Sequence, residues 1–283
     1  MSRIVRIEDP ADPRVEAYRD IRERDLKGRG GRFVIEGEVV LRAAIAQGRF
    51  EIESLLLAEN RTEPLEGLVA GLPAEVGVFV AGRAVLDSLA GFPMHRGVLA
   101  IGLRGRERGA AEMVAQLPAE ALVVVLCGIA NHDNMGGLLR NAAAFGVDLV
   151  LVDEASCDPL YRKAIRVSAG AALTVPFVRA GTVDALVDLL EEAGFTVLAT
   201  SPAGGEALGD VAPSARTAVL FGAEGSGLPP AILSRLVSVR IDMAPGFDSL
   251  NVATTSGIVL HHLRSALARA TASPGLRGGS PRR

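Results

Sequence analysis

Residues 131–153 read NHDNMGGLLRNAAAFGVDLVLVD. Two short runs of Val and Leu, at 122–126 and 149–152, end at turn residues, which is typical of buried parallel strands. Between them, Asn, Asp and Gly precede a helical pattern over 138–145. The stretch therefore predicts a strand–loop–helix–strand unit with its polar groups at the carboxyl end of the first strand, where open α/β sheets bind ligands. Arg140 is a cation in an otherwise nearly uncharged helix.

The composition suits a cytoplasmic globular protein of one or two domains. The 283 residues are 49% hydrophobic and carry a net charge of −3, so no global basic field indicates nucleic acid, although a local patch remains possible. The two cysteines, at 127 and 157, are too few for a disulfide framework and match no zinc spacing, so we expect a reducing compartment and no metal. No signal-peptide core is present, and no apolar run approaches the ~20 residues that cross a bilayer.

Strand and helix patterns alternate after an arginine-dense run at 14–32. That run fits either a solvated amphipathic helix or an arm that contacts nucleic-acid phosphates. Strands are expected at 33–37, 52–59, 78–82 and 97–102, with helices at 38–47, 64–70 and 84–89. We predict a first α/β domain over 1–104 and a charged, Gly-rich linker over 105–118.

The second domain is predicted over 119–271, followed by a disordered tail over 272–283. Its strands are expected at 122–127, 149–152, 175–178, 195–199, 218–221 and 237–241. Its helices are expected at 135–145, 160–169, 183–193, 230–236 and 250–270. Short strands that alternate with helices predict a doubly wound parallel sheet.

Three polar loops each follow a predicted strand of the second domain, at 128–134, 221–230 and 242–255. Strands in one parallel sheet share a direction, so we expect the loops to gather at one edge. The second loop, FGAEGSGLPP, places glycines around Glu224, and glycines let a ligand approach the backbone closely. In the third, DMAPGFDSLNVATT, Asp248 or Ser249 could simply cap the following helix, as Asn134 could cap a helix that begins at Met135.

Two familiar nucleotide sites do not fit. The spacing after Gly128 does not match G-x-G-x-x-G, although Asp153 lies about 20 residues past the loop, where a ribose-binding acid would lie. A nucleotide-dependent oxidoreductase is therefore an alternative that rests on Asp153 alone. A P-loop is absent, and no nucleophile motif accompanies His132, which we interpret as a loop hydrogen bonder.

Together, the three loops resemble the motifs of the SpoU (TrmH-like) RNA ribose methyltransferases of the SPOUT superfamily. Residues 131–146 are similar to the first motif, FGAEGSGL to the second and IDMAPGFDSLNVATTSGIVL to the third, in the same order and with similar separations. The segment CDPLYRKAIRVSAGA between them is also similar, and the resemblance covers about residues 122–263. His132 and Asp133 stand where many members have Pro-Gly. Residues RGGRFVIEGEVVLRAAI and AGFPMHRGVLAIG resemble a substrate-binding domain akin to a kink-turn-binding ribosomal protein.

This resemblance implies a C-terminal SPOUT trefoil-knot parallel-sheet domain preceded by a smaller α/β substrate-binding domain. It implies a homodimer with its active sites at the subunit interface. It further implies methyl transfer from S-adenosyl-L-methionine to a ribose 2′-hydroxyl of RNA, with ribosomal RNA expected first. A tRNA methyltransferase and a non-catalytic RNA-binding or ribosome-assembly factor on the same fold remain alternatives.

Site residues follow from the resemblance, position by position. An arginine keeps its charge in essentially all protein settings, so we expect Arg140 to hold a phosphate and stabilise an alkoxide rather than to act as a free base. We expect RNA contacts from the arginine-dense run and from a basic helix, although a solvated helix face explains the latter equally well. The expected catalytic residues are Asn134, Arg140, Glu224, Ser249 and Asn251; the cofactor contacts are Gly222, Ile241, Met243 and Leu250; the RNA contacts are Arg22, Arg29, Arg32, Arg162 and Lys163.

Overall fold

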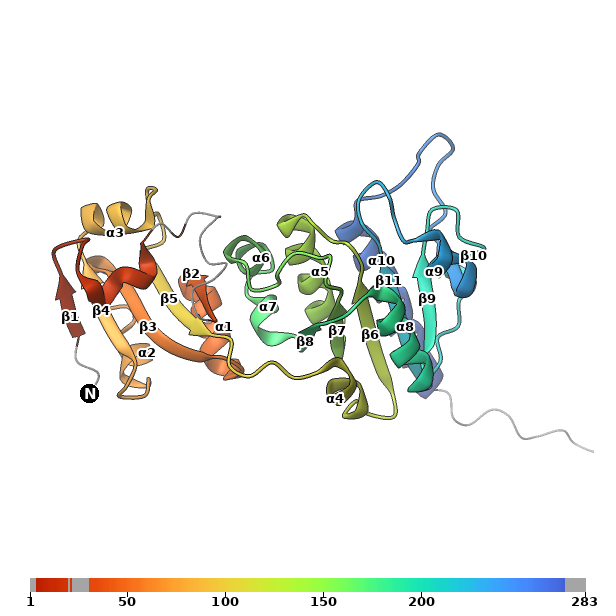
Figure 1. Ribbon diagram of the computed structural model, residues 1–283, viewed down its shortest axis with the longest axis horizontal. Coiled ribbons are helices and arrows are strands. Elements are labelled where there is room, and N and C mark those ends of the chain that lie inside the picture. Colours follow the sequence, from red (N-terminus) through yellow and green to blue (C-terminus); the bar gives the residue numbers. More distant parts are fainter. Residues whose placement is uncertain (1–3, 20, 22–30, 273–283) are drawn as a thin grey trace, which may run out of the picture. The chain divides into compact units, whose positions relative to one another are not determined.

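The computed structural model describes residues 4–19, 21 and 31–272, which form two compact units (Figure 1). Unit 1 contains Met1–Glu107 and Asp158–Thr174, and unit 2 contains Arg108–Cys157 and Val175–Arg283. Both units are α/β, and every strand pairing of unit 2 is parallel, which confirms the predicted α/β class with a parallel sheet in the second domain. Residues 22–30 of the arginine-dense run and 273–283 of the predicted tail lie outside the described residues.

Unit 1 is a mixed five-stranded sheet in the order β1-β4-β3-β5-β2. Its apolar strand faces are covered on one side by η1 and α3, where the buried side chains of Val15, Tyr18, Leu86 and Leu89 share one core. The strands are β1 (Ile4–Ile7), β2 (Arg32–Glu36), β3 (Glu51–Ala58), β4 (Gly77–Ala81) and β5 (Val98–Leu103). The helices are η1 (Pro13–Tyr18), α1 (Glu38–Gln47), η2 (Glu59–Arg61), α2 (Glu66–Ala70), α3 (Arg83–Ala90), α6 (Arg162–Val167) and α7 (Ala171–Thr174).

Helices α6 and α7 come from the middle of the predicted second domain but belong to unit 1. They contact β2 and α1 respectively. Arg162 on α6 is buried against Glu36 of β2, and its Nη1 donates to the Glu36 Oε2 at 2.6 Å. The Arg162 guanidinium also lies 4.8 Å from the centre of the Phe92 ring. The predicted domain division therefore differs from the observed units in this segment.

Unit 2 is a seven-stranded sheet in the order β10-β12-β9-β11-β6-β7-β8. The chain enters at β6, moves outward through β7 and β8, and returns to build the other half from β9 to β12, so the direction reverses between β6 and β11. Ligands bind at such switch points in open α/β sheets. The strands are β6 (Ala121–Leu126), β7 (Leu149–Val152), β8 (Phe177–Arg179), β9 (Thr196–Thr200), β10 (Glu206–Ala207), β11 (Arg216–Phe221) and β12 (Val237–Arg240).

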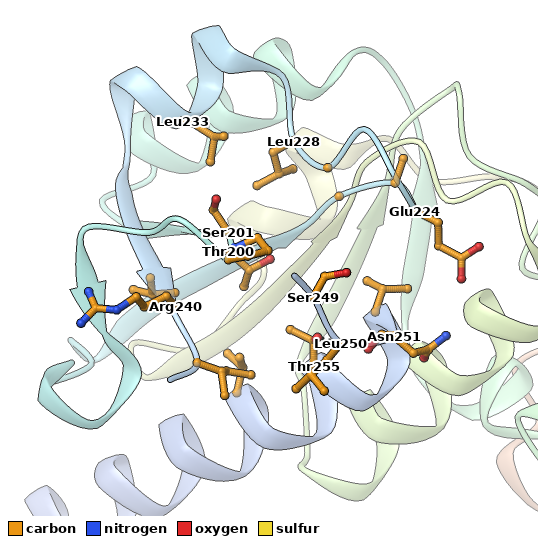
Figure 2. A pocket seen from close by; sticks show the side chains of 18 of the residues that line it. Thr200, Ser201, Glu224, Leu228, Leu233, Arg240, Ser249, Leu250, Asn251 and Thr255 are labelled. Atoms are coloured by element: carbon orange, nitrogen blue, oxygen red, sulfur yellow. Dashed lines mark hydrogen bonds between the residues drawn. The ribbon is translucent and has the colours of Figure 1, made fainter. Parts of the chain in front are cut away.

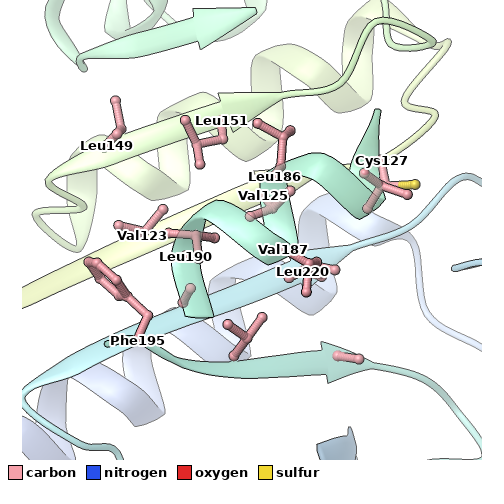
Figure 3. Packing of buried hydrophobic residues seen from close by; sticks show 14 of the residues in the cluster. Val123, Val125, Cys127, Leu149, Leu151, Leu186, Val187, Leu190, Phe195 and Leu220 are labelled. Carbon is pink, nitrogen blue, oxygen red and sulfur yellow. The ribbon is translucent and has the colours of Figure 1, made fainter. Parts of the chain in front are cut away.

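Both faces of the unit-2 sheet are covered, because alternate residues of β6 are buried on opposite sides. Figure 3 shows one face, where Leu186, Val187 and Leu190 of α8 pack on β6, β7 and β11. Helices α5 and α10 pack against each other. The helices are α4 (Ala110–Ala115), α5 (His132–Ala144), α8 (Val183–Glu192), η3 (Leu208–Asp210), α9 (Pro230–Arg235) and α10 (Val252–Ala272).

Helix α4 lies inside the predicted linker at 105–118. Its residue Val114 is buried in the unit-2 core, and Ala110, Met113 and Leu117 pack beside it. These positions recur at helical spacing and give α4 an apolar face. The linker prediction is therefore wrong for residues 110–115, which form a short amphipathic helix.

Candidate active site

A cavity of about 470 Å³ opens at the carboxyl edge of the unit-2 sheet (Figure 2). Its walls come from three segments that each follow a strand: 200–202 after β9, 222–228 after β11 and 241–251 after β12. The first turns of α10 complete the wall through Val252, Thr255 and Val259. Two of the three loops predicted from the sequence therefore meet around one space, whereas the segment at 200–202 was not predicted to contribute.

Loop 222–228 folds back tightly on itself. A Cβ on Gly222 would lie 2.4 Å from the carbonyl carbon of Gly227 and 2.5 Å from the backbone nitrogen of Leu228. Ala223 and Gly227 form an isolated antiparallel bridge, and the φ of Gly225 and Gly227 is positive, at 81° and 66°. Glycine is therefore required both where the loop closes and where it reverses.

A chain of hydrogen bonds joins the three predicted motifs beside this cavity. The Asn134 amide nitrogen donates to Oε1 of Glu224, and the Asn251 amide nitrogen donates to Oδ1 of Asn134 at 2.9 Å. Asn134 is only 5% exposed, so this contact fixes the orientation of its amide. Ser249 and Asn251 both line the cavity, together with Glu224.

Helix α5 is held in position at its N-terminus and along one face. Asn131 caps it by accepting a hydrogen bond from the Asp133 backbone nitrogen at 2.8 Å. Asn141 donates to the carbonyl of Ala253 at 2.6 Å, on the facing helix α10. A Cβ on Gly137 would lie 2.6 Å from the Cβ of Ala253, so glycine permits the close approach of the two helices.

The capping predictions for both helices were wrong. Asn134 lies within the first turn of α5 and bonds to other loops, while Asn131 is the cap. Helix α10 begins at Val252, and Asn251 caps it, since its Oδ1 accepts from the backbone nitrogens of Ala253 at 2.9 Å and Thr254 at 3.3 Å. Asn251 thus caps one helix and holds the amide of Asn134.

Arg140 lies outside the cavity wall. It is exposed and makes no hydrogen bond or ion pair with any residue that the structure describes. It follows Asn134 by six residues, which places it about 240° further around the helix. Asn141 follows Asn134 by seven residues, or about two turns, and therefore lies on the Asn134 face. Arg140 is therefore a free cation on a different face of α5.

The predicted cofactor contacts all lie in the cavity wall, namely Gly222, Ile241, Met243 and Leu250. Among the described residues that line the cavity, Glu224 and Arg240 alone are charged. Arg240 donates to the carbonyls of Gly204 and Gly205 and to Asp242, so its guanidinium is engaged in hydrogen bonds within the protein. Apolar side chains, hydroxyl groups and one carboxylate suit a nucleoside that carries a positive charge, which is the chemistry of S-adenosylmethionine.

Thr200 and Ser201 are cavity residues that sequence reasoning missed. They follow the strand predicted at 195–199, so the position of a polar pair at a strand end was the available signal.

The predicted RNA contacts do not lie together. Arg162 is buried with Glu36, which corrects its prediction as an RNA contact, and Arg32 forms a two-pronged ion pair with Glu53 at 2.6 Å. Lys163 is partly buried on α6, while Arg22 and Arg29 lie outside the described residues.

Asp153 has a structural role. It is 4% exposed and accepts hydrogen bonds from the Gly128 backbone nitrogen and from the Ser156 hydroxyl and backbone nitrogen. The carboxylate connects the segments that follow β6 and β7. Asp153 therefore has a structural explanation and no longer supports the oxidoreductase alternative. Burial, together with the Asp153 carboxylate, raises the pKa of the neighbouring Cys127 thiol to about 12.

Among the described residues, no helix is long and apolar enough to cross a membrane. In the same part of the chain, no cluster of three or more His, Cys, Asp or Glu could hold a metal ion.

Comparisons with known proteins agree with this geometry. The model of the SpoU rRNA Methylase family matches residues 121–261. An uncharacterized tRNA/rRNA methyltransferase of Mycobacterium bovis is 38% identical over 263 residues, which cover 89% of each chain. The 23S rRNA (guanosine-2′-O-)-methyltransferase RlmB of Escherichia coli K12 is 30% identical over 220 residues, which cover 76% of this chain and 90% of RlmB.

Solved structures match across both units. A crystal structure of an RNA 2′-O ribose methyltransferase has a TM-score of 0.76 and 28% identity, covering 94% of this chain and 100% of that one. An AdoMet-bound rRNA methyltransferase from Sinorhizobium meliloti has a TM-score of 0.79 at 22% identity, covering 93% and 98% of the two chains, which shows a shared fold.

Proposed function

The chain belongs to the SpoU rRNA methylase family, and we propose that it transfers a methyl group from S-adenosylmethionine to a ribose 2′-hydroxyl of ribosomal RNA. The observation that carries the proposal is the hydrogen-bonded chain of Glu224, Asn134 and Asn251 at the cavity. Each residue comes from a different motif, and Glu224 and Asn251 line a cavity suited to the cofactor, which a fold that only binds RNA does not need. A non-catalytic assembly factor is therefore disfavoured.

The cofactor, when bound, supplies a methyl group already activated by its sulfonium centre. The protein must then bind and orient the cofactor and the target ribose, and it must exclude water. Apolar side chains of Ile241, Met243 and Leu250 would enclose the adenosine, and loop 222–228 would offer backbone groups at close range. The Glu224 carboxylate lies where it favours a positive charge in the cavity.

Asn134 would position the reacting ribose. Its amide is fixed by Glu224 on one side and Asn251 on the other, so no side-chain reorganisation is needed when the ribose arrives. Ser249 would contribute a hydroxyl to the same wall.

Arg140 would hold a phosphate next to the target ribose and stabilise the charge that develops on the 2′-oxygen. A phosphate oxygen or water would accept the proton, because a guanidinium has no free base at neutral pH. Its exposure and its lack of a described partner leave the side chain free for this task.

We further propose a homodimer. Arg140 points from a face of α5 different from that of Asn134 and does not line its own chain's cavity. A second copy would bring an Arg140 to the ribose at the subunit interface, where the family resemblance implies that the active sites lie. We also expect the trefoil knot, since a threaded C-terminal segment would place residues 241–251 beside loop 222–228, as both line the cavity. We expect the protein in the cytoplasm, together with its RNA.

The test is methyl transfer from labelled S-adenosylmethionine to unmodified transcripts of 23S rRNA, 16S rRNA and tRNA. Mapping of 2′-O-methyl groups on the labelled RNA should give one ribose in a ribosomal transcript, and Arg140→Ala should abolish the signal while cofactor binding persists. Labelling of tRNA alone would replace the ribosomal assignment. If calorimetry finds no binding of S-adenosylmethionine, the whole proposal fails.

A further inference from the structure

We propose that Phe247 stacks on the base of the target nucleotide while the ribose of that nucleotide is methylated. The inference rests on the proposed function, because it assigns a contact for that substrate. Phe247 lies between β12 and α10, in the loop that leads into α10 and projects from unit 2, drawn in blue (Figure 1). Its side chain is 70% exposed.

Phe247 is an exception among the aromatic side chains of this protein. The nine phenylalanines and two tyrosines all lie within the described residues, and the chain has no tryptophan. Every aromatic side chain except Phe247 is buried or half-buried. A single exposed apolar residue is nevertheless common on protein surfaces. The position and the rigidity of Phe247 therefore have to carry the inference, rather than its exposure alone.

Phe247 lies at the rim of the candidate active site. The loop leaves the cavity wall after Met243 and returns to it at Ser249, so residues 244–248 form a tip outside the wall. Two residues of chain span at most about 7 Å, which keeps Phe247 close to Ser249. A base lies one glycosidic bond from its ribose. A nucleotide that presents its 2′-hydroxyl to the cavity therefore brings its base to this rim.

A tight turn at the tip restricts the backbone of Phe247. The Phe247 backbone nitrogen donates to the Ala244 carbonyl at 3.3 Å, which closes a four-residue turn. Pro245 and Gly246 occupy its two central positions, and the φ of Gly246 is 87°. Proline followed by a glycine with positive φ is the pattern of a type II turn. The ring is thus presented on a preorganised backbone, which lowers the entropic cost of binding a base.

The charges around the tip favour a base over a phosphate. Loops 222–228 and 241–251 carry Glu224, Asp242 and Asp248 and no basic residue. Asp248 is exposed directly beside Phe247. The nearest cation in the sequence, Arg240, is engaged with Asp242 and two carbonyl groups. Carboxylates repel the phosphate backbone, whereas the neutral face of a base can stack on an aromatic ring whatever the base is.

This contact restricts the class of RNA that the site accepts. A base inside a duplex has both faces covered by its neighbours, so it cannot stack on Phe247. The target nucleotide must therefore be unpaired, or be extruded from its helix when it binds. Because every base has a stacking face, Phe247 would hold the nucleotide without selecting its identity.

The first experiment uses the absence of tryptophan from the chain. Phe247→Trp introduces a single tryptophan and keeps an aromatic face. Addition of unmodified 23S rRNA transcript should quench its fluorescence as a base stacks on the indole. Val237→Trp is the matched control, because Val237 is 45% exposed at the start of β12, at the sheet edge opposite to the cavity. Its fluorescence should not change with the same RNA.

The second experiment separates stacking from a structural role. Phe247→Leu keeps an apolar side chain without an aromatic face, so its KM for RNA should rise about tenfold. Its kcat at saturating RNA, its affinity for S-adenosylmethionine and its thermal midpoint should stay at wild-type values. Phe247→Trp should retain the wild-type KM, which an effect of lost packing would not explain.

A wild-type KM for Phe247→Leu, unchanged fluorescence of Phe247→Trp at saturating RNA, or equal quenching of Val237→Trp would overturn the inference. A change in the oligomeric mass of Phe247→Leu would also overturn it, by assigning the ring to a contact between subunits. A wild-type protein that binds the transcript without methylating it would refute the proposed function. The two tryptophan variants would then still decide whether a base stacks on Phe247.

Discussion

The amide nitrogen of Asn251 donates a hydrogen bond of 2.9 Å to the amide oxygen of Asn134, across 117 residues of sequence. The same Asn251 side chain uses its oxygen to cap α10. One residue therefore performs two separable tasks, and a pair of substitutions distinguishes them.

Asn251→Ala should lose both tasks. Removal of an N-cap costs about 1 kcal/mol of stability, and release of the Asn134 amide should lower methyl transfer as well. Asn251→Asp keeps the capping oxygen but removes the N–H donor, so it should retain most of the stability and still lose activity. Chemical denaturation and single-turnover methylation measure the two effects. Equal activity of Asn251→Asp and wild type would show that the bond to Asn134 is dispensable.

Glu224→Ala should leave the buried amide nitrogen of Asn134 without its partner, at a cost of about 1–3 kcal/mol. Glu224→Gln retains an acceptor oxygen and should preserve stability, but it removes the negative charge from the cavity and should weaken binding of the cationic cofactor. Isothermal calorimetry with S-adenosylmethionine and with its neutral-sulfur product, S-adenosylhomocysteine, provides the readout. An equal loss for both ligands would contradict a role of the charge.

Gly222→Ala should open loop 222–228, because the added Cβ meets backbone atoms that cannot rotate away. Overpacking of this kind costs about 1–3 kcal/mol. Cofactor affinity should fall together with the thermal midpoint. Gly209→Ala is the control, since a Cβ there meets nothing within 4 Å. The prediction fails if both variants bind the cofactor like wild type.

Arg140→Ala should reduce methyl transfer by on the order of 10²-fold or more, with stability unchanged because the side chain has no described partner. If Arg140 acts on the other subunit's cavity, co-expression with Gly222→Ala should restore activity. A mixed dimer then holds one intact site of two, so it should reach about half of the wild-type rate. Absence of restoration in purified mixed dimers would assign Arg140 to its own chain's cavity.

Alkaline pH should destabilise unit 2 through Cys127. The pKa of this thiol is about 12 in the folded protein, against 9.0 for an ordinary thiol, chiefly because of burial and then because of Asp153. The folded state therefore keeps the proton when the unfolded state loses it, so stability is full below pH 9 and falls as pH rises from 9 towards 12. Cys127→Ala should show a shallower fall than wild type in urea denaturation between pH 8 and pH 10.5. Identical slopes would exclude this thiol as the cause.

Most strands of unit 2 were predictable because their apolar runs are continuous and end at turn residues, whereas the two-residue strand β10 has no such run and was missed. Most predicted boundaries lie within a few residues of the observed ones; β7 matches at both ends. The shared direction of the parallel strands was enough to predict that the loops carrying Glu224 and Asn251 lie at the same edge of the sheet. Helix α4 was missed because its short apolar face stands among glycines and charges.

Long-range partners were beyond sequence reasoning. Asn131 and Asn134 are equally good caps by type, and only the contact with Glu224 decides between them. Arg162 was predicted to contact RNA because nothing near it in the sequence indicates its buried partner, Glu36, which lies 126 residues away. A solvated arginine and a neutralised one have the same local sequence, so only the three-dimensional structure shows that Arg162 is neutralised.

Helix α10 is the last part of the candidate site in the sequence, and it is therefore also the last part to be synthesised. Asn251, which donates to Asn134, directly precedes α10, and Arg264 of α10 donates to the Phe145 carbonyl at the end of α5. A chain that grows from its N-terminus makes unit 1 and most of unit 2 before these residues exist. A nascent chain that has not yet reached Asn251 therefore lacks the bond to Asn134 and part of the cavity wall, so the candidate site forms after both halves of the unit-2 sheet have been synthesised.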